Sequence, residues 1–234
     1  MIKPKSTVIP PSMKILHNGI AVLENDSHIS AWVEESGRLD HDQYALPIIL
    51  QYINPGDTVV DAGAFIGDHT IAYEEAVGPT GTVRAFEPNQ EAFACLKRNC
   101  KHAIKYNIGL SDHHHDGVMA PHENAGMCRM APVSEGSIYA RLAPLDQWNL
   151  DRLDFMKIDV EGFEVRAIQG ARETILRHKP IMWVEVNELA LMQQGESEES
   201  LLSLIYSLGY TITAYPEKGS QYDALCEPIT APVL

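Results

Sequence analysis

Residues 58–67 of the chain read TVVDAGAFIG, and this stretch decides the fold. Its first residues are β-branched and apolar up to Asp61, which is typical of a short buried strand. Gly63 and Gly67 follow where that strand must turn, and residues 69–77 then have a helical pattern. A buried strand that passes through a glycine-containing turn into a helix is the first half of a βαβ unit.

The same alternation continues along the chain. We expect further strands at residues 82–86, 104–108, 155–159, 181–186 and 210–215, and further helices at 89–100, 163–177 and 196–208. Asp42 is expected to cap an earlier helix that ends near Tyr52. Strands separated by helices imply parallel crossovers, so the sequence predicts one α/β domain with a Rossmann-like, doubly wound, mostly parallel sheet.

Two segments depart from this pattern. Residues 1–40 are expected to form a lead-in, with short extended pieces near Trp32–Val33, before the domain of residues 41–234. Residues 111–139 are polar and have no clear period, which predicts a loop or an irregular hairpin insertion. Adjacent side chains on an extended loop point to alternating sides, so His113–His115 are expected to be solvated, with a lid over a ligand as the alternative.

The composition excludes several classes of protein. The 234 residues include 18 basic and 32 acidic ones, which gives a formal net charge of −14 and disfavours binding to nucleic acid. No apolar run approaches the roughly 20 residues of a membrane span, so no membrane partner is expected. The four cysteines are irregularly spaced, which predicts reduced thiols in a cytoplasmic protein.

The turn after the first strand indicates a ligand that contains a nucleoside. The order D-x-G-x-x-x-G from Asp61 to Gly67 differs from the G-x-G-x-x-G of nicotinamide cofactors, which makes an oxidoreductase the weakest interpretation. Glu87 ends the next strand 26 residues after Asp61, a spacing compatible with a carboxylate that accepts hydrogen bonds from ribose hydroxyls. The pattern suits S-adenosylmethionine (SAM), with packing glycines and a helix-capping acid as the alternative.

Two later strands also end in polar residues. Asp159 ends one of them, and Glu185 and Asn187 end the next. Because open α/β sheets bind ligands at the carboxyl ends of their strands, these groups would hold Mg²⁺ or deprotonate a substrate hydroxyl. A buried polar network that fixes the loops is an equal alternative. His41 and His69 lie near the predicted pocket, and either would accept a proton near neutral pH.

Together these motifs resemble the FkbM-type family of SAM-dependent methyltransferases. VVDAGAFIGDHT is similar to the D-x-G-A-x-x-G-x-x-T segment of the family, AFEPN to its acid-Pro segment and NIGLSD to its third-strand segment. KIDVEGFEVRAIQGA matches its most specific block. The resemblance covers about Asp42 to Asn187. Phe65, where the family commonly has Asn, and the histidine-rich insertion depart from the family pattern.

The resemblance implies a cofactor, a reaction and a set of site residues. It implies O-methylation of a hydroxyl on a small molecule, a glycan or a natural-product acceptor. Asp159 would be the catalytic base or a metal ligand, with Glu185 and Asn187 as its partners and His69 as a further proton acceptor. The residues implied around SAM are Asp61, Gly63, Ala64, Phe65 and Gly67 at its methionine portion, Asp68, His69 and Thr70 at its carboxylate, Glu87, Pro88 and Asn89 at its ribose, and Ser111 and Asp112 at its adenine.

Two other functions stay open on the sequence alone. A methyltransferase that acts on nucleic acid or protein is disfavoured by the acidic charge. A non-catalytic protein that binds SAM would lose nothing when Asp159 is replaced. Tyr210, Tyr215 and Tyr222 would form either core or the face of a homodimer, and core is the default interpretation.

Overall fold

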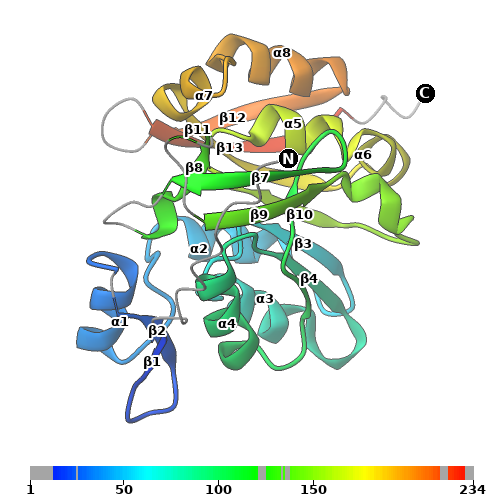
Figure 1. Ribbon diagram of the computed structural model, residues 1–234. Coiled ribbons are helices and arrows are strands. Elements are labelled where there is room, and N and C mark those ends of the chain that lie inside the picture. The colour runs from blue at the N-terminus through cyan, green and yellow to red at the C-terminus, as the bar shows by residue number, and fades with distance from the viewer. Residues whose placement is uncertain are drawn as a thin grey trace.

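A seven-stranded sheet crosses the molecule (Figure 1) in the computed structural model, which describes residues 13–24, 26–120, 125–132, 134, 138–216 and 221–229. The strand order is β12-β13-β11-β10-β3-β4-β5, and β13 alone runs antiparallel to its neighbours. This confirms the predicted doubly wound, mostly parallel sheet. The strands are β3 (Thr58–Ala62), β4 (Thr82–Phe86), β5 (Ile104–Tyr106), β10 (Phe155–Ile158), β11 (Ile181–Asn187), β12 (Tyr210–Pro216) and β13 (Gln221–Pro228).

Helices cover both faces of this sheet. One face carries α5, α6 and α8, and the other carries α2, α3 and α4. The helices are α2 (Ala45–Ile49), α3 (Thr70–Val77), α4 (Gln90–Asn99), α5 (Glu164–Gln169), α6 (Arg172–His178), α7 (Glu188–Gln193) and α8 (Glu198–Ser207), with 3₁₀ turns η1 (Leu50–Tyr52), η2 (Gly78–Thr80), η3 (Ala125–Met127) and η4 (Leu145–Trp148). No helix in these described ranges is both long enough and apolar enough to span a membrane.

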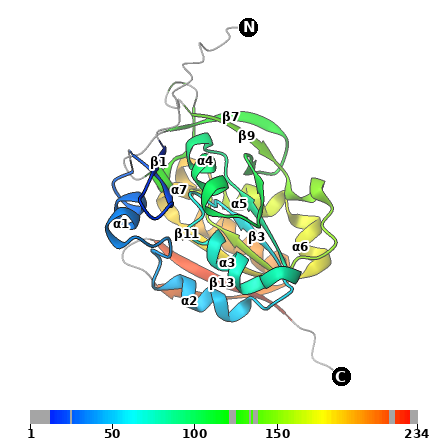
Figure 2. The ribbon, with the colours of Figure 1, turned by 90° about the horizontal axis from the view of Figure 1, so that it is seen from below.

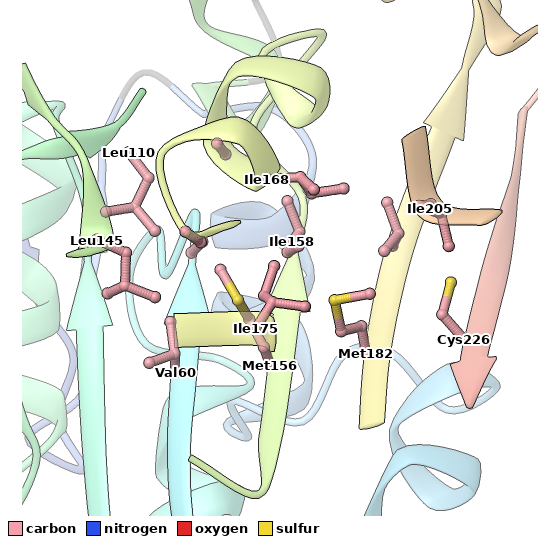
Figure 3. Close-up of a cluster of buried hydrophobic side chains, with 14 of the residues drawn as sticks. Val60, Leu110, Leu145, Met156, Ile158, Ile168, Ile175, Met182, Ile205 and Cys226 are labelled. Carbon is pink, nitrogen blue, oxygen red and sulfur yellow. The ribbon is translucent and has the colours of Figure 1, made fainter. Parts of the chain in front are cut away.

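Alternation along the strands divides the core between the two faces. Val60, Met156 and Met182 lie in a row on three neighbouring strands, where Ile168 and Ile175 of the covering helices face them (Figure 3). The side chains next to them in the same strands point to the other face of the sheet. These are Val59, Phe155 and Trp183, which belong to the hydrophobic cluster under α2, α3 and α4. Strands that are apolar on both faces are typical of a sheet buried between two helical layers, so the short apolar runs in the sequence are explained.

The N-terminal segment corrects one expectation. Trp32–Val33 lies within α1 (Ile29–Ser36), so the extended pieces predicted there are wrong. Gly37 ends this helix with φ +70° and donates its N–H to the carbonyl of Val33. The hairpin of β1 (Met13–Ile15) and β2 (Ala21–Leu23) lies beside α4 (Figures 1 and 2), where the Asn99 side chain bonds both backbone polar groups of Ala21.

The polar insertion is more regular than expected. Its described residues, together with residues 109–110 and 140–143 on either side, form a separate four-stranded sheet in the order β6-β9-β7-β8 (Figure 1). Met119, Ala140 and Leu142 of this sheet pack on Phe163 at the start of α5, which explains why a largely polar segment is ordered. The strands are β6 (Gly109–Leu110), β7 (His115–Ala120), β8 (Arg129–Ala131) and β9 (Ile138–Ala143).

Gly170 fixes the base of this insertion to the main domain. It separates α5 from α6, as its position within the expected helix at residues 163–177 suggested. A Cβ atom at Gly170 would lie 1.9 Å from the carbonyl oxygen of Ser111 and 3.0 Å from Cα of Pro144. The two backbones therefore approach too closely for any side chain at this position.

We predict that Gly170→Ala lowers the free energy of unfolding by about 3 kcal/mol, because the new methyl group must displace backbone atoms. Gly195→Ala is the matched control, since a Cβ at Gly195 meets no atom within 4 Å and only its φ of +79° opposes the change. That control should cost about 1 kcal/mol. Chemical denaturation of both variants measures the difference, and equal losses would contradict the prediction.

Candidate active site

A cavity of about 600 Å³ opens at the carboxyl ends of β3, β4, β10 and β11. Gly63, Glu87, Asp159 and Glu185, which follow or end these four strands, all line it. The small sheet adds Met119 and other apolar side chains to the wall. The volume lies within the range of pockets that enclose small-molecule ligands.

The turn after β3 is pressed against the end of β10. A Cβ atom at Gly63 would lie 1.7 Å from the carbonyl oxygen of Asp159, and Gly63 has φ +84°. Asp61 is fully buried before this turn and accepts a hydrogen bond of 2.5 Å from the Thr70 hydroxyl. Burial raises the pKa of Asp61. Asp61 and Thr70 therefore brace the turn from behind, while Gly63 and Ala64 line the cavity.

Glu87 is held with its carboxylate in the cavity wall. Its two oxygens accept hydrogen bonds from the backbone N–H groups of Phe65, at 2.9 Å, and of Asn89, at 2.7 Å. Phe65 has φ +44°, a left-handed conformation that aims its N–H at this carboxylate. Burial raises the pKa of Glu87 to about 7, although both backbone hydrogen bonds oppose the shift. Pro88 and Asn89 also line the cavity, and Asn89 caps α4.

A buried lysine at the end of β10 is a site residue that sequence reasoning missed. Lys157 is 7% exposed, and its Nζ lies 2.8 Å from Oδ2 of Asp159. Burial lowers the pKa of Lys157, but the attraction of Asp159 and Asp61 outweighs burial and holds that pKa above its ordinary range. The signal was present in the sequence, because Lys157 stands between two apolar residues of a buried strand and two positions before Asp159.

Three carboxylates gather beyond this lysine. Ligand oxygens of Asp159, Glu161 and Glu185 all lie within 4.8 Å of one another. Oε1 of Glu185 accepts a 2.5 Å hydrogen bond from the Gln221 side chain, whereas Oε2 is buried with no hydrogen-bond partner among the residues described. Burial, with the charge of Asp159 adding to it, raises the pKa of Glu161 to about 9 and that of Glu185 well above its ordinary value.

Several predicted site residues lie elsewhere. Asn187 does not line the cavity, and its Oδ1 accepts a hydrogen bond from the N–H of Ala190 and so caps α7. Ser111 donates to Asp112, and neither residue lines the cavity. Gly67 also lies behind the wall, where an added Cβ would be 2.6 Å from Sγ of Cys100.

The histidines divide into two groups. His41 and His69 both line the cavity, as expected. Nδ1 of His41 lies 3.0 Å from Asp68, while His69 is engaged at both ring nitrogens, by Tyr73 at 3.1 Å and by Asp42 at 3.2 Å. Burial lowers the pKa of His41, but the Asp68 carboxylate outweighs burial and raises it. A second group, His113–His115, does not line this cavity.

Comparison with solved structures identifies the fold. An FkbM methyltransferase from Methylobacillus flagellatus matches with a TM-score of 0.53 and 17% identity over 77% of this chain and 50% of its own, so the match spans half of that protein. Fibrillarin from Aeropyrum pernix, solved with natively bound SAM, matches with a TM-score of 0.52 and 11% identity over 81% of this chain and 76% of its own. A TehB-like SAM-dependent methyltransferase from Corynebacterium glutamicum matches with a TM-score of 0.52 and 12% identity over 86% of this chain and 94% of its own.

The neighbours share the class I methyltransferase fold, and at these identities they show the fold alone. A search of curated protein sequences gave no match. The sequence profile of the methyltransferase FkbM domain matches residues 61–212, which is more than half of the chain and includes the turn at Gly63, Glu87 and the carboxylate cluster. The chain therefore belongs to the FkbM family of SAM-dependent methyltransferases.

Proposed function

We propose that this methyltransferase transfers the methyl group of SAM to a hydroxyl group on a small-molecule or glycan acceptor. The observation that carries the proposal is the contact between the Gly63 turn and the backbone of Asp159. This contact brings the turn that suits the cofactor and the carboxylates that suit a hydroxyl into one cavity. Cofactor and acceptor would thus meet without movement of either element.

Two observations support SAM binding on the side of the cavity formed by Gly63, Ala64 and Glu87, which we call the cofactor side. Gly63 and Ala64 line the cavity in a turn that lies against the backbone of Asp159, and Glu87 presents a carboxylate that backbone hydrogen bonds hold in place. Glu87 would accept hydrogen bonds from the ribose hydroxyls, and Gly63 and Ala64 would flank the methionine portion. When bound, SAM supplies a methyl group already activated by a positively charged sulfur.

Proton removal is assigned to Asp159. Its side chain is 35% exposed, lines the cavity and is fixed by the ammonium group of Lys157. A hydroxyl aligned at Asp159 would pass its proton to this carboxylate while the hydroxyl oxygen bonds to the methyl carbon and the bond between that carbon and sulfur breaks, which leaves S-adenosylhomocysteine. Glu185 would orient the hydroxyl. His69 is less suited to accept the proton, because both of its ring nitrogens already have partners.

The acceptor side combines polar and apolar surface. Met119, Met130 and Phe163 pack together and supply apolar surface to the cavity that the carboxylates also line. Acidic groups at the reacting end would repel a phosphate-bearing acceptor, whereas a neutral hydroxyl can donate hydrogen bonds to them. This combination favours an acceptor with an apolar body and hydroxyl groups over a nucleic acid.

Incubation with methyl-tritiated SAM and a panel of sugars, phenols and hydroxylated natural products tests the proposal. The expected result is label in a methyl ether, identified by mass spectrometry of the product. Label on nitrogen or carbon would contradict O-methylation. Binding of S-adenosylhomocysteine (SAH) without transfer to any acceptor would favour the non-catalytic alternative.

We predict that Asp159→Asn lowers turnover at least a hundredfold and changes SAH affinity by less than about threefold. The amide keeps the shape of the carboxylate but cannot accept the proton of the acceptor. Calorimetric titration with SAH and the tritium assay give the two readouts. Glu199→Gln on the exposed side of α8 is the charge-matched control and should alter neither. Retained turnover in Asp159→Asn would remove Asp159 from the catalytic role.

Cofactor affinity should depend on pH through Glu87. Its pKa is about 7 in the free protein, and ribose hydroxyls that donate to the carboxylate would lower it. Binding then releases a proton, so SAH affinity should rise with pH up to about pH 7, by at most about tenfold per pH unit, and then level off. Glu87→Gln should bind SAH more weakly, and its SAH affinity should no longer rise with pH up to about pH 7. Equal pH slopes in both proteins, measured by calorimetry, would contradict the assignment.

A further inference from the structure

We infer that Asp159, Glu161 and Glu185 form a binding site for a divalent cation that prefers oxygen ligands, such as Mg²⁺ or Mn²⁺. Their ligand oxygens lie within 4.8 Å of one another. Oxygens on opposite sides of a bound ion are about 4.0–5.2 Å apart across the range from Mg²⁺ to Ca²⁺. The three groups therefore lie close enough for small side-chain movements to bring them onto one ion. This ligand set differs from the one expected from the sequence, because Glu161 takes the place of Asn187.

A second observation points to a ligand at this position. Glu185 is 8% exposed, and its Oε2 lies in the interior without a hydrogen-bond partner among the residues described. A buried carboxylate oxygen that lacks a partner costs free energy unless a cation or a donor meets it. The Gln221 side chain holds the other oxygen of Glu185, so this carboxylate is oriented with Oε2 left for a ligand.

The loop after β10 is built to present Glu161. Glu161 has φ +54°, which is a costly conformation for a residue with a side chain. Glu164, fully buried, accepts hydrogen bonds through Oε1 from the N–H groups of Val160, at 3.0 Å, and Gly162, at 3.1 Å. Glu164 thus holds the two residues that flank Glu161 and acts as a positioning residue for it.

The charges of the cluster match a divalent ion. When ionised, the three carboxylates carry three negative charges, and Lys157 compensates one of them through its 2.8 Å contact with Asp159. Two negative charges remain in the wall of the cavity. A divalent cation would neutralise them, while the ammonium group of an acceptor would neutralise only one.

The role of such an ion rests on the proposed methyl transfer. An ion held at Asp159, Glu161 and Glu185 would lie where the acceptor hydroxyl is expected, and it would lower the pKa of that hydroxyl. Its binding, however, depends only on residues of this chain and can be measured without an acceptor. The cation inference and the proposed function can therefore fail separately.

The test is calorimetric titration of the chelator-treated full chain with MnCl₂, with the electron paramagnetic resonance signal of free Mn²⁺ as a second readout. The wild type is expected to bind one ion per chain. Glu161→Gln and Glu185→Gln should each weaken Mn²⁺ binding more than tenfold. Glu199→Gln removes the same charge from an exposed position on α8 and should bind Mn²⁺ like the wild type.

SAH titration of each variant provides the fold control, because Glu161 does not lie on the cofactor side of the cavity. If Glu161→Gln does not fold, Glu185→Gln gives the same comparison. Absence of Mn²⁺ binding in a wild type that binds SAH would overturn the cation inference and leave the proposed function standing. Mn²⁺ affinity equal in the wild type and in both Gln variants would place the ion elsewhere and overturn it as well.

Discussion

Lys157 places an ammonium group at the buried end of β10, 2.8 Å from Asp159 and within electrostatic reach of Asp61 and Asp68. Removing one partner from such a buried set leaves uncompensated charge, which costs several kcal/mol. The turn after β3, with Asp61, and the end of β10, with Asp159, therefore share one counter-ion. The charge of Lys157 thus links the strand that leads into the Gly63 turn to the carboxylate end of the cavity.

Much of the fold and part of the site could be predicted from the sequence. Asp61, Gly63, Glu87, Asp159 and Glu185 come together because parallel strands end at one edge of a sheet, and that rule requires only the order of strands and helices. The structure also confirms the mostly parallel sheet that this order of strands and helices predicts. The rule cannot show which way a side chain near a strand end turns.

The structure departs from the sequence prediction at two side chains, one strand and one helix, and each departure has a physical cause. The spacing of Asp159 and Glu161 suggests that only one of them faces the site, whereas both do, because Glu161 has a positive φ in a loop held by Glu164. Asn187 leaves the site because an amide at the start of a helix caps that helix. Strand β13 was missed because its position between β11 and β12 depends on pairing with distant residues. The short helix α1 was missed because a segment of eight residues with Trp32 and Val33 at its centre also suits a strand.

The small sheet β6-β9-β7-β8 has a further consequence for how such enzymes diverge. It supplies apolar side chains to the acceptor side of the cavity, yet none of its strands pairs with a strand of the main sheet in the described chain. Substitutions on its cavity face would alter the shape offered to an acceptor while the hydrogen bonds of the central sheet stay intact. Acceptor preference could thus drift among relatives at little expense in stability, with the cofactor side unchanged.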